Sequence, residues 1–94
     1  MITLDILCTR LTTLRIEDLH RWIVEGHVRA ERQGETLLFE EIDVERIRLI
    51  LDLRDGMQVN EEALPVVLSL LDQLYALRRQ LQRAEIPEKN ADLL

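Results

Sequence analysis

The stretch NEEALPVVLSLLDQLYALRRQLQRA, residues 60–84, decides how the rest of the chain is interpreted. Its apolar residues recur at alternating steps of four and three, the heptad spacing of a helix that packs against another helix. A second apolar stripe lies beside this seam, so the apolar face is wider than a two-stranded coiled coil needs. The seam consists of Ala63, Val67, Leu70, Leu74, Leu77, Leu81 and Ala84, and the second stripe consists of Leu64, Leu68, Leu71 and Tyr75.

A helix of this length spans about 37 Å, which is more than a domain of this size can cover. We therefore expect one stripe to pack on the chain's own body and the other on a second copy of the chain. For the first half of the helix, burial of both stripes within one core is the simpler interpretation. The residues predicted to form the dimer contact are Val67, Leu70, Leu74, Leu77 and Leu81.

Composition and charge exclude several classes of protein. The chain has 94 residues, a formal net charge of −6 and one cysteine. An acidic chain lacks the positive surface that non-specific nucleic-acid binding needs, and it favours a basic partner. A single cysteine excludes an intramolecular disulfide and fits a reducing compartment. Because we see neither a signal peptide nor an apolar run of membrane-spanning length, we expect a soluble cytoplasmic protein.

The N-terminal residues have the pattern of a helix-turn-helix. Apolar residues at helical spacing predict helices over Ile2–Leu11 and Ile16–Glu25, separated by a turn at Thr12 and Thr13 and ended by Gly26. Two short helices joined by a tight turn form this motif. The residues expected on the buried faces are Leu4, Leu7, Cys8 and Leu11 in the first helix, and Ile16, Leu19 and Ile23, with Trp22 beside them, in the second.

A hairpin and a third helix are expected next. Gln33-Gly34-Glu35 is a turn signal before the strand-forming run Thr36–Phe39, and Phe39 is the expected anchor of the hairpin on the helices. Glu40–Asp55 has a helical apolar pattern that ends at Gly56. The residues expected on its buried face are Ile42, Val44, Ile47, Ile50, Leu51 and Leu53.

The predicted fold is mainly α, in a single domain. It comprises a body over residues 1–59, a long C-terminal helix over 60–86 and a flexible tail over 87–94. Asn60 is the expected N-cap of the long helix. Pro65 lies a turn later than proline prefers, so an irregular start or a kink is expected there.

No catalytic constellation is visible, so we expect neither an enzyme nor a cofactor or metal site. His20 and His27 have no Cys or His at metal-ligand spacing, and Cys8 is expected to be a small core residue. The one electrostatic feature is residues 40–62, which carry eight acidic residues against three arginines, a balance of −5. A solvated surface is the simpler interpretation. The more specific interpretation is a docking face for a basic protein surface. Its predicted contact residues are Asp43, Asp52, Asp55 and Trp22.

The order of these elements resembles that of the MerR-like winged helix-turn-helix proteins. Two runs carry the resemblance: Gly26-His27-Val28 through Phe39-Glu40-Glu41-Ile42-Asp43-Val44, and Leu53-Arg54-Asp55-Gly56 at the end of the third helix. Within this superfamily, Leu64–Leu74 and the leucine- and arginine-rich Tyr75–Arg83 are most similar to the CbpM family of chaperone modulators. The resemblance covers the chain up to about Ala84.

Departures from the MerR pattern point away from DNA. In the second helix, MerR regulators carry Leu-Arg-Tyr-Tyr-Glu, whereas this chain has Leu19-His20-Arg21-Trp22-Ile23. In the wing, Leu37 occupies the position where MerR regulators usually have an arginine. The turn between the first two helices also lacks the usual glycine. Phosphate contacts need arginine and lysine side chains, so these losses indicate that the DNA-reading face has been lost or reused.

The resemblance to CbpM implies a protein-binding role. CbpM proteins bind the J-domain of the DnaJ-like co-chaperone CbpA and restrain both its stimulation of a DnaK-type Hsp70 and its DNA binding. The J-domain presents a basic helix, which an acidic partner can occupy. The alternative is a MerR-type DNA-binding regulator with Ile16–Glu25 in the major groove, and a third interpretation is a purely structural dimerisation module. The basic residues that support the alternative are Arg15, Arg21, Arg29 and Arg32.

Overall fold

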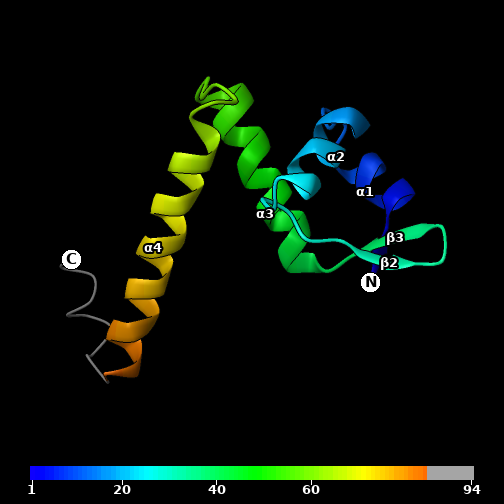
Figure 1. The fold of residues 1–94 in the computed structure, drawn as a ribbon. Helices are drawn as coiled ribbons and strands as arrows, with labels where there is room; N and C mark the ends of the chain where they lie inside the picture. Colours follow the sequence, from blue (N-terminus) through cyan, green and yellow to red (C-terminus); the bar gives the residue numbers. More distant parts are fainter. Residues whose placement is uncertain (85–94) are drawn as a thin grey trace. The chain divides into compact units, whose positions relative to one another are not determined.

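The computed structural model describes residues 1–84, and this part of the chain is mainly helical with a small antiparallel sheet of three strands (Figure 1). It forms two compact units, Met1–Leu64 and the chain from Pro65 on, which are described separately. Within the described residues, no helix is long and apolar enough to cross a membrane. The predicted tail over 87–94 lies outside the described residues. In chain order the elements are β1 (Ile2–Thr3), α1 (Leu4–Arg10), α2 (Ile16–Val24), β2 (Glu31–Gln33), β3 (Thr36–Phe39), α3 (Glu41–Leu51), the π-helical turn η1 (Asp52–Gly56) and α4 (Leu64–Arg83).

The start of the chain differs from the prediction. Ile2 and Thr3 form a strand, not the first turn of a helix, and α1 begins only at Leu4. Thr3 marks this change because its side-chain oxygen accepts a hydrogen bond from the backbone N–H of Ile6 at 3.4 Å, which caps the helix. The predicted turn at residues 12–13 is confirmed.

Helix α2 ends as the sequence predicts. Gly26 adopts a φ of 82°, which is accessible to glycine without strain, and the backbone N–H of His27 donates to the carbonyl of Trp22 at 2.8 Å. The prediction that Ile16 is buried is wrong, since it is 57% exposed. The buried face centres on Leu19 and Trp22, and Ile16 lies about 120° around the helix from Trp22.

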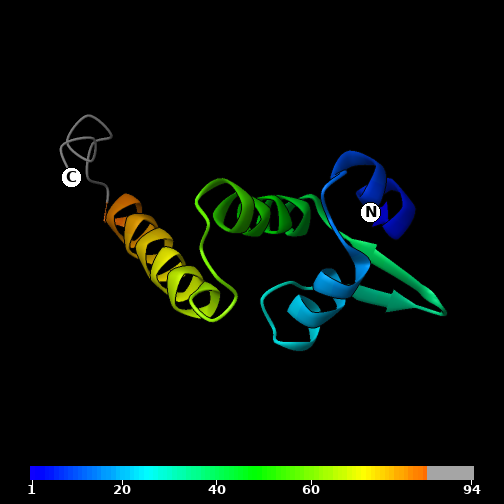
Figure 2. The same ribbon diagram turned by 90° about the horizontal axis from the view of Figure 1, so that it is seen from above.

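The sheet is built on the predicted hairpin. A two-residue turn at Gly34 and Glu35 joins β2 to β3, and Gly34 has a φ of 65° that suits such a turn. Strand β1 pairs with the other side of β3, with Ile2 opposite Phe39, so the order is β1-β3-β2. The two strands of the hairpin are seen side by side in Figure 2. Phe39 is fully buried, which confirms it as the anchor.

Helix α3 buries most of its predicted face. The backbone N–H of Glu40 donates to the Asp43 carboxylate at 2.9 Å, which secures the helix start. Ile42 is an error of the prediction, because it is 71% exposed. It lies two residues before the buried Val44, about 200° away around the helix, so the two cannot share a face.

The end of the third helix is wound more widely than predicted. Residues 52–56 form a π-helical turn, and the backbone N–H of Met57 donates to the carbonyl of Asp52 at 3.0 Å. The residue with a left-handed backbone is Gln58, at a φ of 56°, not Gly56. The backbone N–H of Val59 then donates to the carbonyl of Leu53 at 2.8 Å, which closes the end.

The core of the first unit draws on every helix within it. Its fully buried side chains combine one indole, one phenyl ring and aliphatic residues of α1, α2 and α3. This mixture fills the space between the helices and the sheet without a buried charge among the described residues. The largest fully buried side chains of this unit are Trp22, Phe39, Leu7, Leu19, Ile47, Ile50, Leu64 and Val44.

The irregular start of the long helix is confirmed. Asn60 accepts a hydrogen bond from the N–H of Ala63 through its side-chain oxygen, at 2.8 Å, but it caps a turn over residues 61–63 and α4 begins at Leu64. Pro65 therefore lies in the first turn of α4, where its missing N–H leaves no hydrogen bond unmade. Within the described residues the helix ends at Arg83.

Candidate functional site

A network of charged side chains joins three parts of the first unit: α2, η1 and the turn before α4. Its members, called here the arginine–carboxylate network, are Asp18, Arg21, Trp22, Arg54, Asp55 and Glu61. Two arginines lie between three carboxylates, so the network has a net charge of −1 if all five groups are charged. Its side chains are partly exposed, apart from the indole ring at its centre.

Arg21 contacts two of the carboxylates from α2. Its Nη2 lies 3.0 Å from Oδ1 of Asp18 and 2.9 Å from Oε1 of Glu61. The first contact is local, because residues three apart are neighbours on a helix surface. The second crosses from α2 to the turn before α4 and fixes that turn to the helix.

Arg54, from η1, shares the carboxylate of Asp18 with Arg21 and also contacts Asp55. Its Nη1 donates to Oδ2 of Asp18 at 2.6 Å, and its Nε and Nη2 donate to the two oxygens of Asp55 at 2.9 and 3.3 Å. The hydrogen bonds from Arg54 lower the pKa of Asp55, and the hydrogen bonds to Asp55 raise the pKa of Arg54. Both groups are therefore held in their charged forms.

Trp22 is the fully buried member of this network. Its Nε1 donates to Oε2 of Glu61 at 3.3 Å, and the guanidinium carbon of Arg54 lies 5.4 Å from the centre of its ring, within the range of a cation–π contact. The sequence predicts Trp22 as a partner contact, but a ring with no exposed surface cannot touch a partner in this conformation. We therefore leave Trp22 out of the proposed contact set.

The three predicted acidic contact residues do not lie together. Asp52 and Asp55 belong to η1, whereas Asp43 lies in the first turn of α3, nine residues and about 13 Å along the helix from Asp52. Asp52 is exposed and its side chain makes no ion pair or hydrogen bond within residues 1–84. Asp55 and Asp43 are both engaged by hydrogen bonds.

Much of the acidic run at residues 40–62 is neutralised by the chain itself. Glu41 forms an ion pair with Arg10 at 3.1 Å, and Glu45 forms one with Arg48 at 2.6 Å. The sequence balance of −5 already includes Arg48, but Arg10 and Arg21 lie outside this run and pair with Glu41 and Glu61, which brings the balance to −5 + 2 = −3. Asp52 and Glu62 are its exposed, unpaired members within the described residues.

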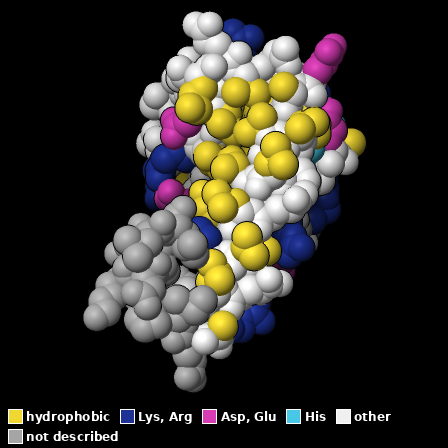
Figure 3. Space-filling model, turned by 90° about the vertical axis from the view of Figure 1, so that its left-hand side faces the viewer, with side chains coloured by type: hydrophobic (Ala, Val, Ile, Leu, Met, Phe, Trp, Pro, Cys, Tyr) yellow, Lys and Arg dark blue, Asp and Glu magenta, His cyan; other side chains and the backbone are white. Residues whose placement is uncertain are grey.

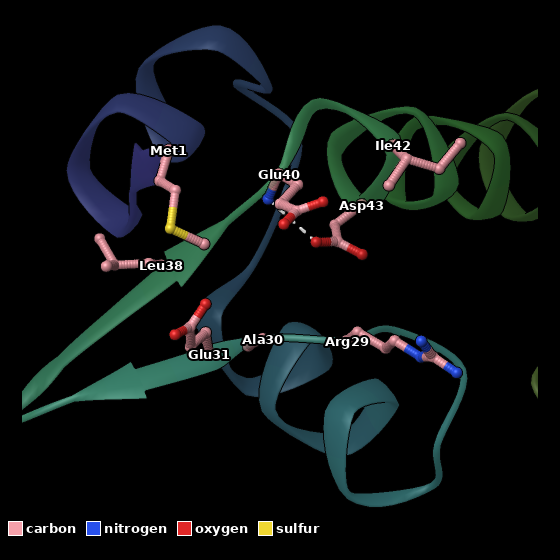
Figure 4. Close-up of a pocket in the computed structure, with 8 residues that line it drawn as sticks. All are labelled: Met1, Arg29, Ala30, Glu31, Leu38, Glu40, Ile42 and Asp43. Atoms are coloured by element: carbon pink, nitrogen blue, oxygen red, sulfur yellow. Dashed lines mark hydrogen bonds between the residues drawn. The ribbon is translucent and has the colours of Figure 1, made fainter.

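An open pocket of about 330 Å³ lies between the hairpin and the start of α3 (Figure 4). Carboxylates of Glu31, Glu40 and Asp43 border it, and Figure 4 shows the hydrogen bond from Glu40 to Asp43 at its edge. The apolar part of its lining comes from Met1, Leu38 and Ile42, and Arg29 and Ala30 complete it. The exposed Ile42, which the sequence pattern assigned to the core, lines this pocket.

The four arginines that the sequence offers for a nucleic-acid interface differ in whether they are paired within the chain. Arg21 is engaged by two carboxylates, so its charge is largely compensated. Arg15, Arg29 and Arg32 are exposed and form no ion pair within the described residues. The structure therefore leaves three of the four predicted arginines available.

The second unit presents an apolar surface along α4. Hydrophobic side chains form a band along this helix in the space-filling view (Figure 3). The first two residues of the second stripe, Leu64 and Leu68, are buried, and Tyr75 at its end is exposed. Leu70, Leu74 and Leu77 of the seam are exposed, Leu77 by 54%. Val67 and Leu81 of the predicted seam are half-buried. Most of the seam is thus accessible in the single chain.

Possible metal-ligating side chains do not cluster in the described residues. No group of three or more His, Cys, Asp or Glu side chains within residues 1–84 is placed to hold a metal ion. Nε2 of His27 lies 3.1 Å from a carboxylate oxygen of Glu25, without the geometry of a hydrogen bond. Cys8 is half-buried and His20 is exposed on α2.

The sequence-based contact set did not include four members of the network: Asp18, Arg21, Arg54 and Glu61. Asp18 and Arg21 stand three residues apart in a predicted helix, a spacing that favours an ion pair and could have revealed this contact. Glu61 lies 40 positions beyond Arg21, and no local pattern indicates that contact. Comparison of the chain with family models, curated proteins and solved structures found no match to any of them.

Proposed function

We propose that this chain is a non-catalytic chaperone modulator of the CbpM type. It binds the J-domain of a DnaJ-like, CbpA-type co-chaperone and inhibits both that protein's stimulation of Hsp70 and its DNA binding. In the first unit, two short helices, a hairpin and a third helix follow one another in the order of a MerR-like winged helix-turn-helix. Such a protein acts in the cytoplasm, together with its co-chaperone.

The observation that carries this proposal is the charge of α2. In a winged helix-turn-helix this helix would enter the major groove, where cationic side chains hold it to phosphates. Here its only arginine, Arg21, is held by Asp18 and Glu61, and Glu17 and Asp18 occupy its first turn. A surface of this charge repels a nucleic-acid backbone and attracts a basic protein.

The proposed contact surface is the acidic end of the third helix. Asp52 is exposed and unpaired within the described residues, and the carboxylate of Asp55 is half exposed beside it. Exposed charges of this kind steer association and set its salt dependence more than they supply affinity. Asp43, at the other end of α3, is a second contact point for an extended basic helix.

We also propose that α4 pairs two copies of the chain. Its exposed leucines, Leu70, Leu74 and Leu77, follow the heptad spacing that one helix presents to another. Apolar side chains in such a row are more stable when covered, and a second copy supplies a matching row. Val67 and Leu81 extend the proposed contact in both directions.

The second candidate function is that of a MerR-type transcriptional regulator. The observation in its favour is the set of exposed arginines without an ion pair among the described residues: Arg15 before α2, and Arg29 and Arg32 at the hairpin. An electrophoretic mobility shift at moderate salt separates the candidates, because tight sequence-specific binding of DNA would overturn the first.

The direct test is a binding titration with the isolated J-domain of a CbpA-type co-chaperone, followed by an Hsp70 ATPase assay. We expect a saturable complex and a loss of the ATPase stimulation that the co-chaperone produces. Absence of binding at low salt, where opposite charges attract most strongly, would overturn the proposal.

A further inference from the structure

The arginine–carboxylate network is saturated by the chain's own side chains. Each of the six carboxylate oxygens of Asp18, Asp55 and Glu61 has a nitrogen of the chain within 3.3 Å. Arg21 and Arg54 supply five of these contacts, and the indole of Trp22 supplies the sixth. A basic partner therefore finds these acids already occupied by cations of the same chemistry that it would bring.

The two arginines are held very differently. Arg54 uses Nε, Nη1 and Nη2, lies over the Trp22 ring, and has a side chain that is 21% exposed. Arg21 reaches both of its carboxylates through Nη2 alone, and its side chain is 42% exposed. A planar guanidinium is held best when several of its nitrogens are engaged, so Arg21 is the one that exchanges more readily.

We propose that Arg21 is an internal competitor for the partner's cation. In this mechanism a lysine or arginine side chain of the partner takes the place of Arg21 at Glu61 and Asp18, while Arg54 stays in place. The inference rests on the proposed function only in assigning the partner, and the exchange itself follows from the contacts of Arg21.

Such an exchange raises the selectivity of the surface. A single cation gains little, because it forms one ion pair only after another has been broken. A basic segment that also reaches the unpaired Asp52 gains a contact without a matching loss. The internal arginine thus penalises isolated charges and favours a partner with several correctly spaced ones.

Trp22 gives this exchange a direct signal. It is the only tryptophan of the chain, and its Nε1 donates to the same Glu61 carboxylate that Arg21 contacts. When Arg21 leaves Glu61, the environment of that hydrogen bond changes. The single indole N–H resonance in a proton–nitrogen correlation spectrum therefore reports the exchange.

The test is a titration of the full chain with an acetylated, amidated tetralysine peptide, followed through the indole resonance. We expect Arg21→Gln to bind the peptide about two- to five-fold more tightly than the wild type, the size of effect that one exposed ion pair supplies. Arg21→Lys keeps a competing cation and should bind as the wild type does. Arg10→Gln and Arg48→Gln remove the same charge from the Glu41 and Glu45 ion pairs and serve as matched controls.

Several outcomes would overturn the inference. It fails if Arg10→Gln or Arg48→Gln tightens binding as much as Arg21→Gln does, because the effect would then be one of net charge. It also fails if the peptide binds to the wild type without moving the indole resonance. A separate titration with the J-domain tests the proposed function, and failure there leaves the tetralysine result standing as evidence on the exchange.

Discussion

Asp55 shows how one ion pair links the stability of this chain to pH. Its pKa is lowered in the folded chain by the two hydrogen bonds from Arg54. Between the folded and unfolded pKa values the unfolded chain binds more protons, so the free energy of unfolding rises with pH in that interval. We expect the contribution of Asp55 to be complete above about pH 5 and to be lost as the pH falls through the folded pKa.

Urea unfolding at pH 7, 5, 4 and 3 measures this contribution. The variant Asp55→Asn should lose less stability than the wild type between pH 5 and pH 3, because it has no carboxylate to protonate. Asp52→Asn, at an exposed residue without an ion pair in the described part of the chain, is the control for the removal of one carboxylate from η1. If the free energy of unfolding falls equally with pH in the wild type and in Asp55→Asn, Asp55 does not make the pH-dependent contribution proposed here.

Charge reversal at single residues of η1 tests the proposed docking surface. We expect the double variant Asp52→Lys, Asp55→Lys to bind the J-domain roughly tenfold more weakly and with a smaller salt dependence, because attraction becomes repulsion. Calorimetry at two ionic strengths measures both effects. The double variant Glu31→Lys, Glu35→Lys carries the same net charge on the hairpin, and an equal loss of affinity there would place the docking surface elsewhere.

At the scale of elements, Gly26 after α2 and Gly56 at the end of η1 can be compared directly. An added Cβ would meet no atom within 4 Å at either Gly26 or Gly56. Only Gly26 has a left-handed backbone, with a φ of 82°, whereas Gly56 lies within the π-helical turn. Substitution by alanine therefore isolates the effect of backbone conformation.

We expect Gly26→Ala to lower the free energy of unfolding by about 1 kcal/mol, the cost of a left-handed conformation for a residue with a Cβ. Gly56→Ala should raise it by about 0.5–1 kcal/mol, since alanine favours helical winding and restricts the unfolded chain. Thermal or urea unfolding distinguishes the two. Destabilisation of similar size by both variants would show that Gly56 needs a conformation other than a helical one.

The elements with a clear period were predictable, and those set by distant pairing were not. Helices α1 to α4 and the hairpin follow from apolar spacing and from the turn at Gly34. Strand β1 has two residues and exists because Ile2 meets Phe39, 37 positions later, which no local pattern reveals. The π-helical turn continues through Gly56, so the left-handed residue after the helix is Gln58 and not the glycine that the sequence indicates.

The candidate site was predictable only in part, for the same reason. The acidic character of residues 40–62 follows from composition, but ion pairing does not. Glu61 meets Arg21 and Trp22 across about 40 positions, so the sequence could not show that these acids are occupied. Ile16 and Ile42 were misassigned because an isoleucine at the start of a helix satisfies an apolar pattern without being covered.

At the scale of the whole molecule, the exposed seam of α4 predicts self-association. We expect the wild type to sediment as a dimer and Leu77→Arg or Leu81→Arg to raise the dimer dissociation constant at least about tenfold, because each places a charge in an apolar contact. The control is Val24→Arg, at an exposed apolar residue of α2 outside the seam, which should leave the dimer intact. A wild type that sediments as a monomer at high concentration would refute the proposed pairing.

The pairing of β1 with β3 also bears on how the chain folds during its synthesis. The first strand emerges from the ribosome early, but the residues that complete its hydrogen bonds are added only when Leu38 and Phe39 have been joined. Closing a loop of this length costs conformational entropy, which is offset only when the hydrogen bonds between β1 and β3 have formed. The buried side of helix α1, with Leu7, therefore gains permanent cover only after Leu38 and Phe39 have left the ribosome, and a pause in translation before that point would prolong the interval.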